Sequence, residues 1–156
     1  MASVELFRLL KSDFAATPFD GEGARLHGGR WNTKGKPCVY LGGSRAICVV
    51  ETLVHLQVVQ KLPLFSMFQI TVPESEILRL DEPYWPDDWT NDPAPLSTKQ
   101  IGDDWLASED SLVLYVPSSV VIGEWNALLN PSHPSAKDVI ATARGVDFSL
   151  DPRLVK

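Results

Sequence analysis

Glu51 is the residue of this 156-residue chain whose type and position most suggest chemistry. Apolar residues spaced by three and four, such as Ile47, Val50 and Val54, predict a helix from Ala46 to Val59 that begins after Ser44 as N-cap. Glu51 lies on the apolar face of that helix, where an unpaired charge is costly. Two interpretations stay open: a structural ion pair with an arginine of the first third of the chain, or a functional carboxylate.

A glycine-rich segment provides a candidate anion-binding residue, Arg30. It follows Gly28 and Gly29, which allow backbone and ligand to approach closely, and its planar guanidinium can bind phosphate through two hydrogen bonds. The alternative is a turn in which Arg30 packs on Trp31. Tyr40, near the end of a predicted buried strand, offers a ring for stacking and a hydroxyl for a hydrogen bond, and a core tyrosine is the alternative.

Two serines stand at the end of the most strongly predicted strand. Ser118 and Ser119 follow Pro117, at a place where a hydroxyl can point into a cleft rather than the core. No general base for either serine can be identified from the sequence, so a nucleophilic Ser–His–acid arrangement is not predicted.

The histidines and the absent motifs exclude several other chemistries. His27, His55 and His133 are far apart and lack the spacing of metal ligands, so we expect no metal site. The sequence contains no GxxxxGK(S/T) phosphate loop, no GxGxxG after a strand, no HExxH and no GxSxG.

Length and composition describe one domain, residues 1–156, and the helices and strands predicted along the chain make it α+β. Fourteen basic and twenty acidic residues give a net charge of −6, which argues against a general nucleic-acid binder. The balance is +2 over residues 1–60 and −8 over residues 61–110, so the first third can still receive a small anion. Two cysteines and no apolar run of ~20 residues lead us to expect a cytoplasmic protein with reduced thiols, neither secreted nor membrane-inserted.

The elements that must position the candidate residues are mostly strands. Strands are predicted over Glu5–Leu10, Cys38–Leu41, Leu64–Val72 and Ser111–Val116, with Ser119–Ile122 extending or restarting the last and Gly145–Leu150 adding an edge strand. Asp20–Asn32 is predicted to be a loop, because its four glycines and interspersed charges suit neither the periodicity of a helix nor that of a strand.

The acidic segment from Asp81 to Asp110 is predicted to be an irregular excursion with one short helix near Ser97–Leu106. Its tryptophans would pin it to the core, and a second interpretation makes it the cover of an active site.

Five segments, in order along the chain, carry a resemblance to a known family. They are FRL at Phe7–Leu9, GGRWN at Gly28–Asn32, VYLG at Val39–Gly42, ETLVHL at Glu51–Leu56 and VPSSVVIGEWNALLNPSHP at Val116–Pro134. Each is weak alone, but their order and spacing are specific and span nearly the whole chain. On these segments the chain resembles the RES domain family, bacterial toxins named for an Arg, a Glu and a Ser and usually encoded beside an Xre-type antitoxin.

The resemblance implies both a fold and a site. The fold would be α+β and ADP-ribosyltransferase-like, with two small, mostly antiparallel sheets around an NAD cleft and flanking helices. The residues at the motif positions are Arg30, Tyr40, Glu51 and Ser118, supported by Arg8 and Asn126 as NAD-binding residues. The serine is doubled in this sequence. Ser118 is preferred because it directly follows the proline, Ser119 is the substitute, and the role of Trp125 is left open.

The implied activity is cleavage of the nicotinamide–ribose bond of NAD+, by hydrolysis or phosphorolysis, with NAD+ as substrate and without a prosthetic group. Glu51 would stabilise the positive charge that develops on the ribose, and Arg30 would grip the pyrophosphate. Tyr40 would stack on the nicotinamide or its ribose. Ser118 would bond to the ligand or orient Glu51.

Two other functions remain alternatives at this stage. A protein ADP-ribosyltransferase would use the same NAD site, whereas a noncatalytic NAD- or anion-binding interaction module would not need Glu51. The family also implies an Xre-type antitoxin that blocks the cleft within a higher-order toxin–antitoxin complex. The net charge and the lack of a long apolar run lead us to expect no direct contact of this chain with nucleic acid or membrane.

Overall fold

A computed structural model describes residues 2–56 and 62–155 of the chain, and its framework is a mixed β-sheet. Within these residues the sheet has seven strands in the order β4-β5-β6-β2-β1-β3-β7. All pairs are antiparallel except β4 with β5. The strands are β1 (Ser3–Lys11), β2 (Val39–Gly42), β3 (Phe65–Pro73), β4 (Ile77–Arg79), β5 (Val113–Pro117), β6 (Trp125–Leu129) and β7 (Arg144–Val146).

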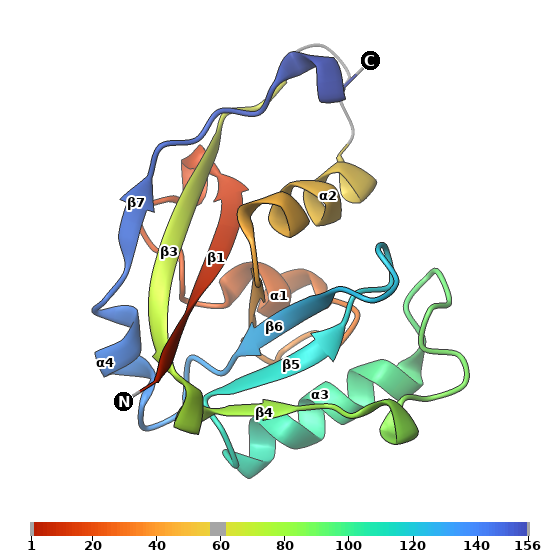
Figure 1. The fold of residues 1–156 in the computed structure, drawn as a ribbon. Helices are drawn as coiled ribbons and strands as arrows, with labels where there is room; N and C mark the ends of the chain where they lie inside the picture. Colours follow the sequence, from red (N-terminus) through yellow and green to blue (C-terminus); the bar gives the residue numbers. More distant parts are fainter. Residues whose placement is uncertain (1, 57–61, 156) are drawn as a thin grey trace.

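The sheet consists of two halves with a narrow connection. β1 pairs with β3 along its whole length, from Ser3 opposite Pro73 to Lys11 opposite Phe65. Its ladder with β2 is a single residue pair, Phe7 opposite Gly42. In Figure 1 the half formed by β1, β3 and β7 accordingly stands at a steep angle to the half formed by β4, β5 and β6. The two small sheets expected from the sequence are therefore joined at one pair of residues into one continuous sheet.

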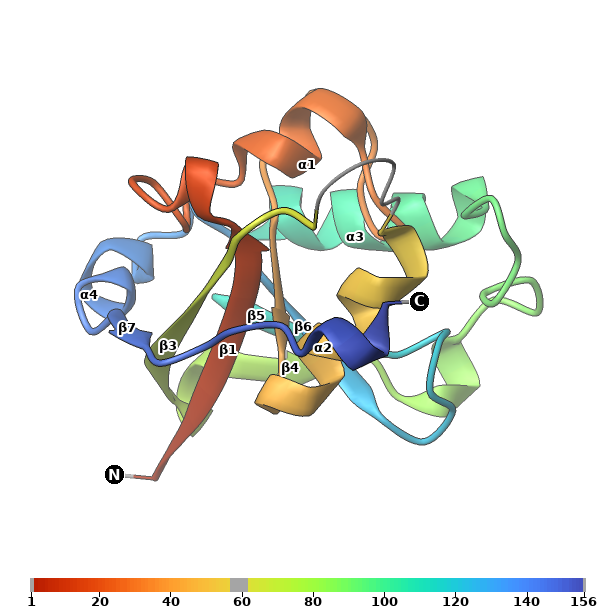
Figure 2. The ribbon, with the colours of Figure 1, turned by 90° about the horizontal axis from the view of Figure 1, so that it is seen from above.

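Four α-helices and four single-turn 3₁₀ helices complete the described part of the chain. The α-helices are α1 (Glu22–His27), α2 (Arg45–His55), α3 (Leu96–Ser108) and α4 (Ala136–Ile140), and the 3₁₀ helices cover Ser12–Phe14, Glu74–Glu76, Glu82–Tyr84 and Pro152–Leu154. α2 packs against β1 and β2, and α4 packs against β3. Figure 2 shows α1 and α3 along one side of the molecule, where Ala24 and Trp105 join the same apolar cluster.

Neighbouring residues of the central strands belong to two different apolar clusters. Val113 and Ala127 lie in one with Leu6 and Ile70 of β1 and β3. Leu114 and its neighbour across the sheet, Leu128, lie in the other with Trp31 and Trp105. Because side chains alternate between the two faces of a sheet, β5 and β6 separate a core under β1 and β3 from a core under α3.

Most predicted strands and both predicted helices are confirmed, with ends shifted by one or two residues, except that α2 already ends at His55. α2 begins after Ser44, whose hydroxyl accepts the Ile47 N–H at 3.1 Å. The last three residues of the predicted helix, 57–59, lie outside the described residues.

Two predictions of local structure are wrong, and a third, the edge strand Gly145–Leu150, is confirmed only in part. The predicted loop Asp20–Asn32 contains α1, which is held by local polar contacts rather than by an apolar face. Ser119–Ile122 forms bends and a turn instead of a strand, and the edge strand β7 ends at Val146. Within the described ranges, no helix is long and apolar enough to span a membrane.

Candidate active site

Glu51 lies on α2 and accepts two hydrogen bonds on the same carboxylate oxygen. The Ser118 hydroxyl donates to Oε1 at 2.6 Å and the Asn126 Nδ2 group donates to it at 2.7 Å. Within residues 2–56 and 62–155 no group bonds to Oε2. The ion-pair interpretation of Glu51 is wrong, since the ion pairs found in the described residues join Arg25 to Glu22 and Arg153 to Asp151. Two neutral donors instead fix one oxygen of the carboxylate and leave the other able to face a ligand.

Ser118 is held in place by the turn that follows β5. Its backbone N–H donates to the Glu124 carbonyl at 2.9 Å, and its hydroxyl oxygen accepts from Val120 N at 3.2 Å and Val121 N at 3.0 Å. The side chain is completely buried, so it does not open into a cleft. Of the two serines it is Ser118 that contacts Glu51, and its bonds make it a positioning residue.

Asn126 reaches Glu51 from the first half of β6. Asn126 lies opposite Val116, and the next pair, Pro117 with Trp125, is the last of the β5–β6 ladder. Ser118 and Asn126 therefore lie at the same end of the two strands. The Nδ2 group of Asn126 must face the carboxylate, because only the amide nitrogen can donate. Oδ1 is then buried without a hydrogen-bond partner in the described part of the chain. Buried acceptors are rarely left unpaired, so this oxygen is an open position for a donor.

Arg30 makes no hydrogen bond to these three residues within the described ranges and contacts the acidic excursion instead. Its Nη1 group donates to the carbonyl oxygen of Trp89 at 3.0 Å and to that of Asn91 at 2.8 Å. The separation in sequence between the acidic segment and this arginine is therefore not a separation in space. The excursion lies against the proposed anion-binding residue, and Arg30 does not merely pack on Trp31.

The Tyr40 hydroxyl bonds to the loop from Gly29 to Thr33, the glycine-rich loop that carries Arg30. The hydroxyl donates to Asn32 Oδ1 at 2.5 Å and accepts from the Trp31 N–H at 3.0 Å. A Cβ atom on Gly29 would collide with this hydroxyl, so this glycine makes room for Tyr40 rather than for a ligand. Burial raises the pKa of Tyr40 well above its ordinary value. Its hydroxyl is thus a neutral structural group in this state.

Arg8 of β1 bonds to the backbone of β2 at Tyr40. Its Nε donates to the Pro18 carbonyl at 2.5 Å and its Nη1 donates to the Tyr40 carbonyl at 3.0 Å. Burial lowers the pKa of the guanidinium from its ordinary value. Arg8 thereby ties β1 to β2 close to the single residue pair that joins the two halves of the sheet.

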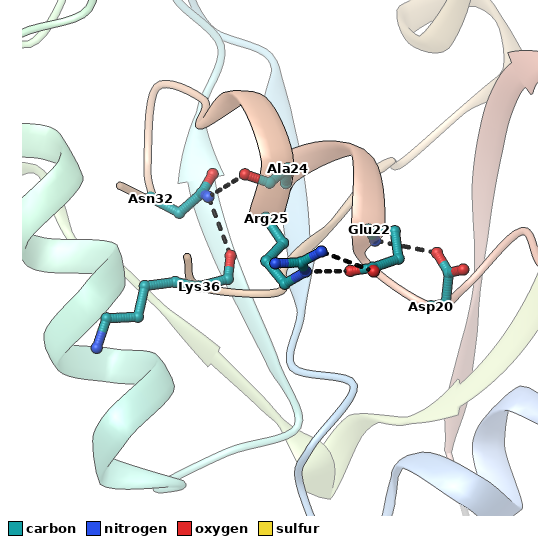
Figure 3. Close-up of polar contacts among 6 residues, drawn as sticks. All are labelled: Asp20, Glu22, Ala24, Arg25, Asn32 and Lys36. Atoms are coloured by element: carbon teal, nitrogen blue, oxygen red, sulfur yellow. Dashed lines mark hydrogen bonds and ion pairs between the residues drawn. The ribbon is translucent and has the colours of Figure 1, made fainter. Parts of the chain in front are cut away.

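Asn32 holds the loop that carries Arg30 through side-chain hydrogen bonds, a role that was not predicted from the sequence. Its Nδ2 group contacts the carbonyl oxygens of Ala24 and Lys36, as Figure 3 shows, and that of Thr33. The side chain is completely buried. Beside it in Figure 3, Arg25 pairs with Glu22, so α1 and the loop form one locally bonded unit. The signal in the sequence was an Asn directly after Arg30 and Trp31 in a glycine-rich segment.

The excursion also reaches the other end of the site through Trp125. Trp85 packs against Trp125 with ring centroids 5.9 Å apart and against Trp89 at 5.0 Å. The guanidinium of Arg79 lies 4.5 Å from the centroid of the Trp125 ring. The tryptophans therefore attach the excursion to β6, next to Asn126, while Arg30 attaches it to the glycine-rich loop.

The structure thus brings the predicted residues together as two groups. Glu51, Ser118 and Asn126 form a hydrogen-bonded carboxylate centre, and Arg8, Tyr40 and Arg30 belong to a network around the glycine-rich loop. Two surface hollows, of about 220 and 430 Å³, lie elsewhere and contain none of these six residues. The described residues contain no cluster of three or more His, Cys, Asp or Glu suited to a metal ion.

Known proteins similar to this chain span almost its entire length. A protein called Toxin Res from Yersinia enterocolitica is 43% identical over 149 residues, covering 96% of this chain and 98% of that protein. A protein called Prs ADP-ribosylating toxin, from a Sphingobium strain, is 38% identical over 92% of this chain and 90% of its own length.

A solved structure supports the fold independently. A chain of the M. tuberculosis MbcT–MbcA toxin–antitoxin complex matches with a TM-score of 0.73 at 20% identity, over 98% of this chain and 87% of that chain. The likeness agrees with the predicted ADP-ribosyltransferase-like α+β fold. The model of the RES domain matches residues 5–151. The chain belongs to the RES domain family.

Proposed function

We propose that this protein is the toxin of a toxin–antitoxin system and that it cleaves the nicotinamide–ribose bond of NAD+, by hydrolysis or phosphorolysis. The observation that carries the proposal is the Glu51 carboxylate, with Oε1 fixed by two donors and Oε2 bonded to no group in the described residues. The names of the relatives, Toxin Res among them, support the assignment as a toxin.

The reaction suits a single oriented carboxylate. As the bond between the ribose carbon and the nicotinamide nitrogen breaks, the electron pair leaves with the neutral ring and positive charge develops on the sugar. A fixed carboxylate beside the sugar stabilises this transition state more than the ground state. An oxygen of water or phosphate then bonds to the ribose carbon, and water loses a proton in doing so. The leaving ring needs no acid, so one carboxylate suffices.

The other predicted residues have roles that agree with their contacts. Arg30 would bind the diphosphate with those of its donors that the Trp89 and Asn91 carbonyls do not occupy. Asn126 Oδ1 lacks a donor next to Glu51, and we expect a ribose hydroxyl to supply one. Tyr40 would offer only its ring, since its hydroxyl is bonded to the loop. Arg8 would act by holding β2 in place.

A second candidate function is transfer of ADP-ribose to a protein. It is favoured by one specific finding, the 38% identity to a protein called Prs ADP-ribosylating toxin. The same carboxylate would stabilise the same transition state, and a nucleophile of the target protein would replace water or phosphate. A noncatalytic NAD- or anion-binding module would not require the oriented Glu51, and this alternative ranks below the two enzymes.

The proposal includes a partner and a place in the cell. The structural likeness to a chain of a toxin–antitoxin complex supports an antitoxin partner for this protein. We propose that the partner is of the Xre type, that it blocks the NAD site within a higher-order complex, and that the toxin acts in the cytoplasm. NAD+ would be a substrate rather than a resident cofactor.

One incubation tests the activity and separates the candidates. Purified protein is mixed with NAD+ with and without phosphate, and the products are separated by chromatography and identified by mass spectrometry. Free nicotinamide with ADP-ribose indicates hydrolysis, and a phosphorylated ADP-ribose that appears only with phosphate indicates phosphorolysis. Nicotinamide release that requires added cell extract, with ADP-ribose attached to a protein, indicates transfer. No nicotinamide release under any of the three conditions refutes the enzymatic proposal.

A further inference from the structure

The loop from Gly29 to Thr33, which carries Arg30, lies on α3 and is fixed to it almost residue by residue. The Gly29 carbonyl accepts from Lys99 Nζ at 2.7 Å, and Thr33 donates from its backbone N–H and its hydroxyl to Asp103 at 3.0 and 2.7 Å. Between these contacts, a Cβ atom on Gly102 would overlap the Trp31 carbonyl oxygen. The helix is thus a support against which the loop is closely packed.

Thr98 provides the contact to Arg30 itself. Its hydroxyl lies 2.6 Å from the Arg30 carbonyl oxygen and 3.1 Å from that of Pro95. Because the hydroxyl has one proton, the shorter contact is the hydrogen bond that it donates. Thr98 is completely buried, so water cannot replace this bond. The backbone of Arg30 is therefore fixed to the first turn of α3.

The residue before it, Ser97, fixes the side chain of Arg30 indirectly. The Ser97 hydroxyl donates to Asp88 Oδ1 at 2.5 Å, and the Asp88 carbonyl accepts from the Asn91 N–H at 2.9 Å. The turn so anchored presents the Trp89 and Asn91 carbonyls to Nη1 of Arg30. Ser97 and Thr98 together hold Arg30 at both ends, its backbone and the tip of its side chain.

The contacts of Arg30 leave one edge of its guanidinium open. The two Nη1 protons match the two carbonyl acceptors, whereas Nε and Nη2 bond to no group within residues 2–56 and 62–155. The Nε–Nη2 edge presents two parallel N–H groups, the arrangement that binds two oxygens of one phosphate.

We propose that Thr98 and Ser97 are positioning residues that aim the Nε–Nη2 edge of Arg30 at the diphosphate of a dinucleotide. This inference rests on the proposed function for the identity of the ligand. The diphosphate does not change when the nicotinamide leaves, so its grip contributes equally in the ground and transition states. Loss of either positioning hydroxyl therefore raises KM and leaves kcat nearly unchanged.

The test compares the Thr98→Val, Thr98→Ser and Ser97→Ala variants with the wild-type protein. Kinetics of nicotinamide release give KM and kcat, and calorimetry gives the Kd for ADP-ribose, which contains the diphosphate but cannot react. Thr142→Val is the matched control, since the Thr142 hydroxyl also contacts a carbonyl three residues earlier, Val139, on α4. Circular dichroism spectra establish that each variant is folded.

We expect Thr98→Val and Ser97→Ala to raise KM and the ADP-ribose Kd by about tenfold, as small displacements of a binding group do, with kcat within about twofold of wild type. Thr98→Ser restores the hydroxyl and both constants, and Thr142→Val changes neither. If Thr98→Val does not fold, Ser97→Ala decides. Unchanged KM and Kd in the folded variants, or a fall in kcat alone, overturns the inference.

Failure of the proposed function gives a different result. A wild-type protein that releases no nicotinamide but binds ADP-ribose refutes cleavage, while the Kd values of the variants still test the positioning of Arg30. Absence of ADP-ribose binding by the wild-type protein overturns the positioning inference itself.

Discussion

The Ser118 hydroxyl donates a hydrogen bond of 2.6 Å to Oε1 of Glu51, across 67 positions of the sequence. Asn126 donates to the same oxygen from β6. The turn after β5, which carries Ser118, and the strand β6, which carries Asn126, thereby orient a carboxylate on α2, which precedes both in the sequence. In the proposed mechanism Glu51 is the group that acts, and the two donors are the groups that position it.

Replacement of Glu51 by Gln should abolish most of the activity without unfolding the protein. The amide oxygen of Gln can still accept from Ser118 and Asn126, so the change in stability should stay within about 1 kcal/mol. The rate of nicotinamide release should fall by roughly 10²–10³-fold, because a neutral amide cannot stabilise positive charge on the ribose. Glu124→Gln, at an exposed position of the neighbouring turn, is the control and should retain full activity. A folded Glu51→Gln protein with unchanged rate would remove Glu51 from the mechanism.

Ser118→Ala should lower both stability and activity, and Ser119→Ala should leave both almost unchanged. Alanine at position 118 removes one donor from Glu51 and leaves the Val120 and Val121 N–H groups without their acceptor. Because Ser118 is completely buried and the two N–H groups are partly buried, we expect a cost of about 1–3 kcal/mol. Urea denaturation and nicotinamide release measured on both variants test this pair. Equal effects of the two substitutions would contradict the assignment of Ser118.

Gly102→Ala should destabilise the protein by about 1–3 kcal/mol, since the added methyl group overlaps the Trp31 carbonyl oxygen and forces α3 away from the loop. Gly23→Ala in α1 is the matched control, because a Cβ atom there meets nothing within 4 Å. That control should be neutral or more stable by up to about 1 kcal/mol through helix propensity. Free energies of unfolding from urea titration distinguish the two. A destabilised Gly23→Ala variant with a normal Gly102→Ala variant would contradict the packing described.

Stability should decrease as the pH rises from about 9 to about 11, and Cys48 should account for part of the loss. Burial raises the pKa of the Cys48 thiol from 9.0 to about 11. In the unfolded chain the thiol loses its proton first, so the folded state is favoured below pH 9 and loses this advantage toward pH 11. Burial raises the pKa of Cys38 and Tyr40 too, which adds a loss of the same sign. Urea denaturation at pH 8 and pH 10.5 measures it.

The control for this titration is Cys48→Ala. Its free energy of unfolding should depend less steeply on pH over the same range, while the contributions of Cys38 and Tyr40 persist. An identical slope in the variant and the wild-type protein would show that Cys48 does not contribute.

Elements with strong periodic patterns could be predicted from the sequence, and elements held by local polar contacts could not. β1 and β3 pair along their full lengths, and their β-branched and aromatic residues indicated strands. α1 has no buried residue and depends on Asp20, Glu22 and Arg25, so no apolar periodicity marked it. β6 was not predicted, because its apolar run after Asn126 covers only three residues before Asn130 and Pro131.

The contact between Ser118 and Glu51 could be predicted as one of two roles for the serine, but the other contacts of the candidate site residues could not. The motif segments selected Glu51 and Ser118, and the structure places them in contact. No pattern in the sequence indicated that the Tyr40 hydroxyl would form hydrogen bonds to the glycine-rich loop. The contact between Arg30 and the excursion joins residues about sixty positions apart, and such contacts depend on how the whole chain folds.

The order of the strands has a consequence for how the protein is made. β2 and α2 emerge early from the ribosome, but β2 pairs along its whole length with β6, which is synthesised much later. Both residues that donate hydrogen bonds to Glu51 also follow Pro117 in the sequence. A domain folds as a unit during synthesis, once the segments that complete it have emerged. A partly synthesised chain therefore carries the carboxylate without the groups that orient it, and its candidate centre forms only when most of the protein exists.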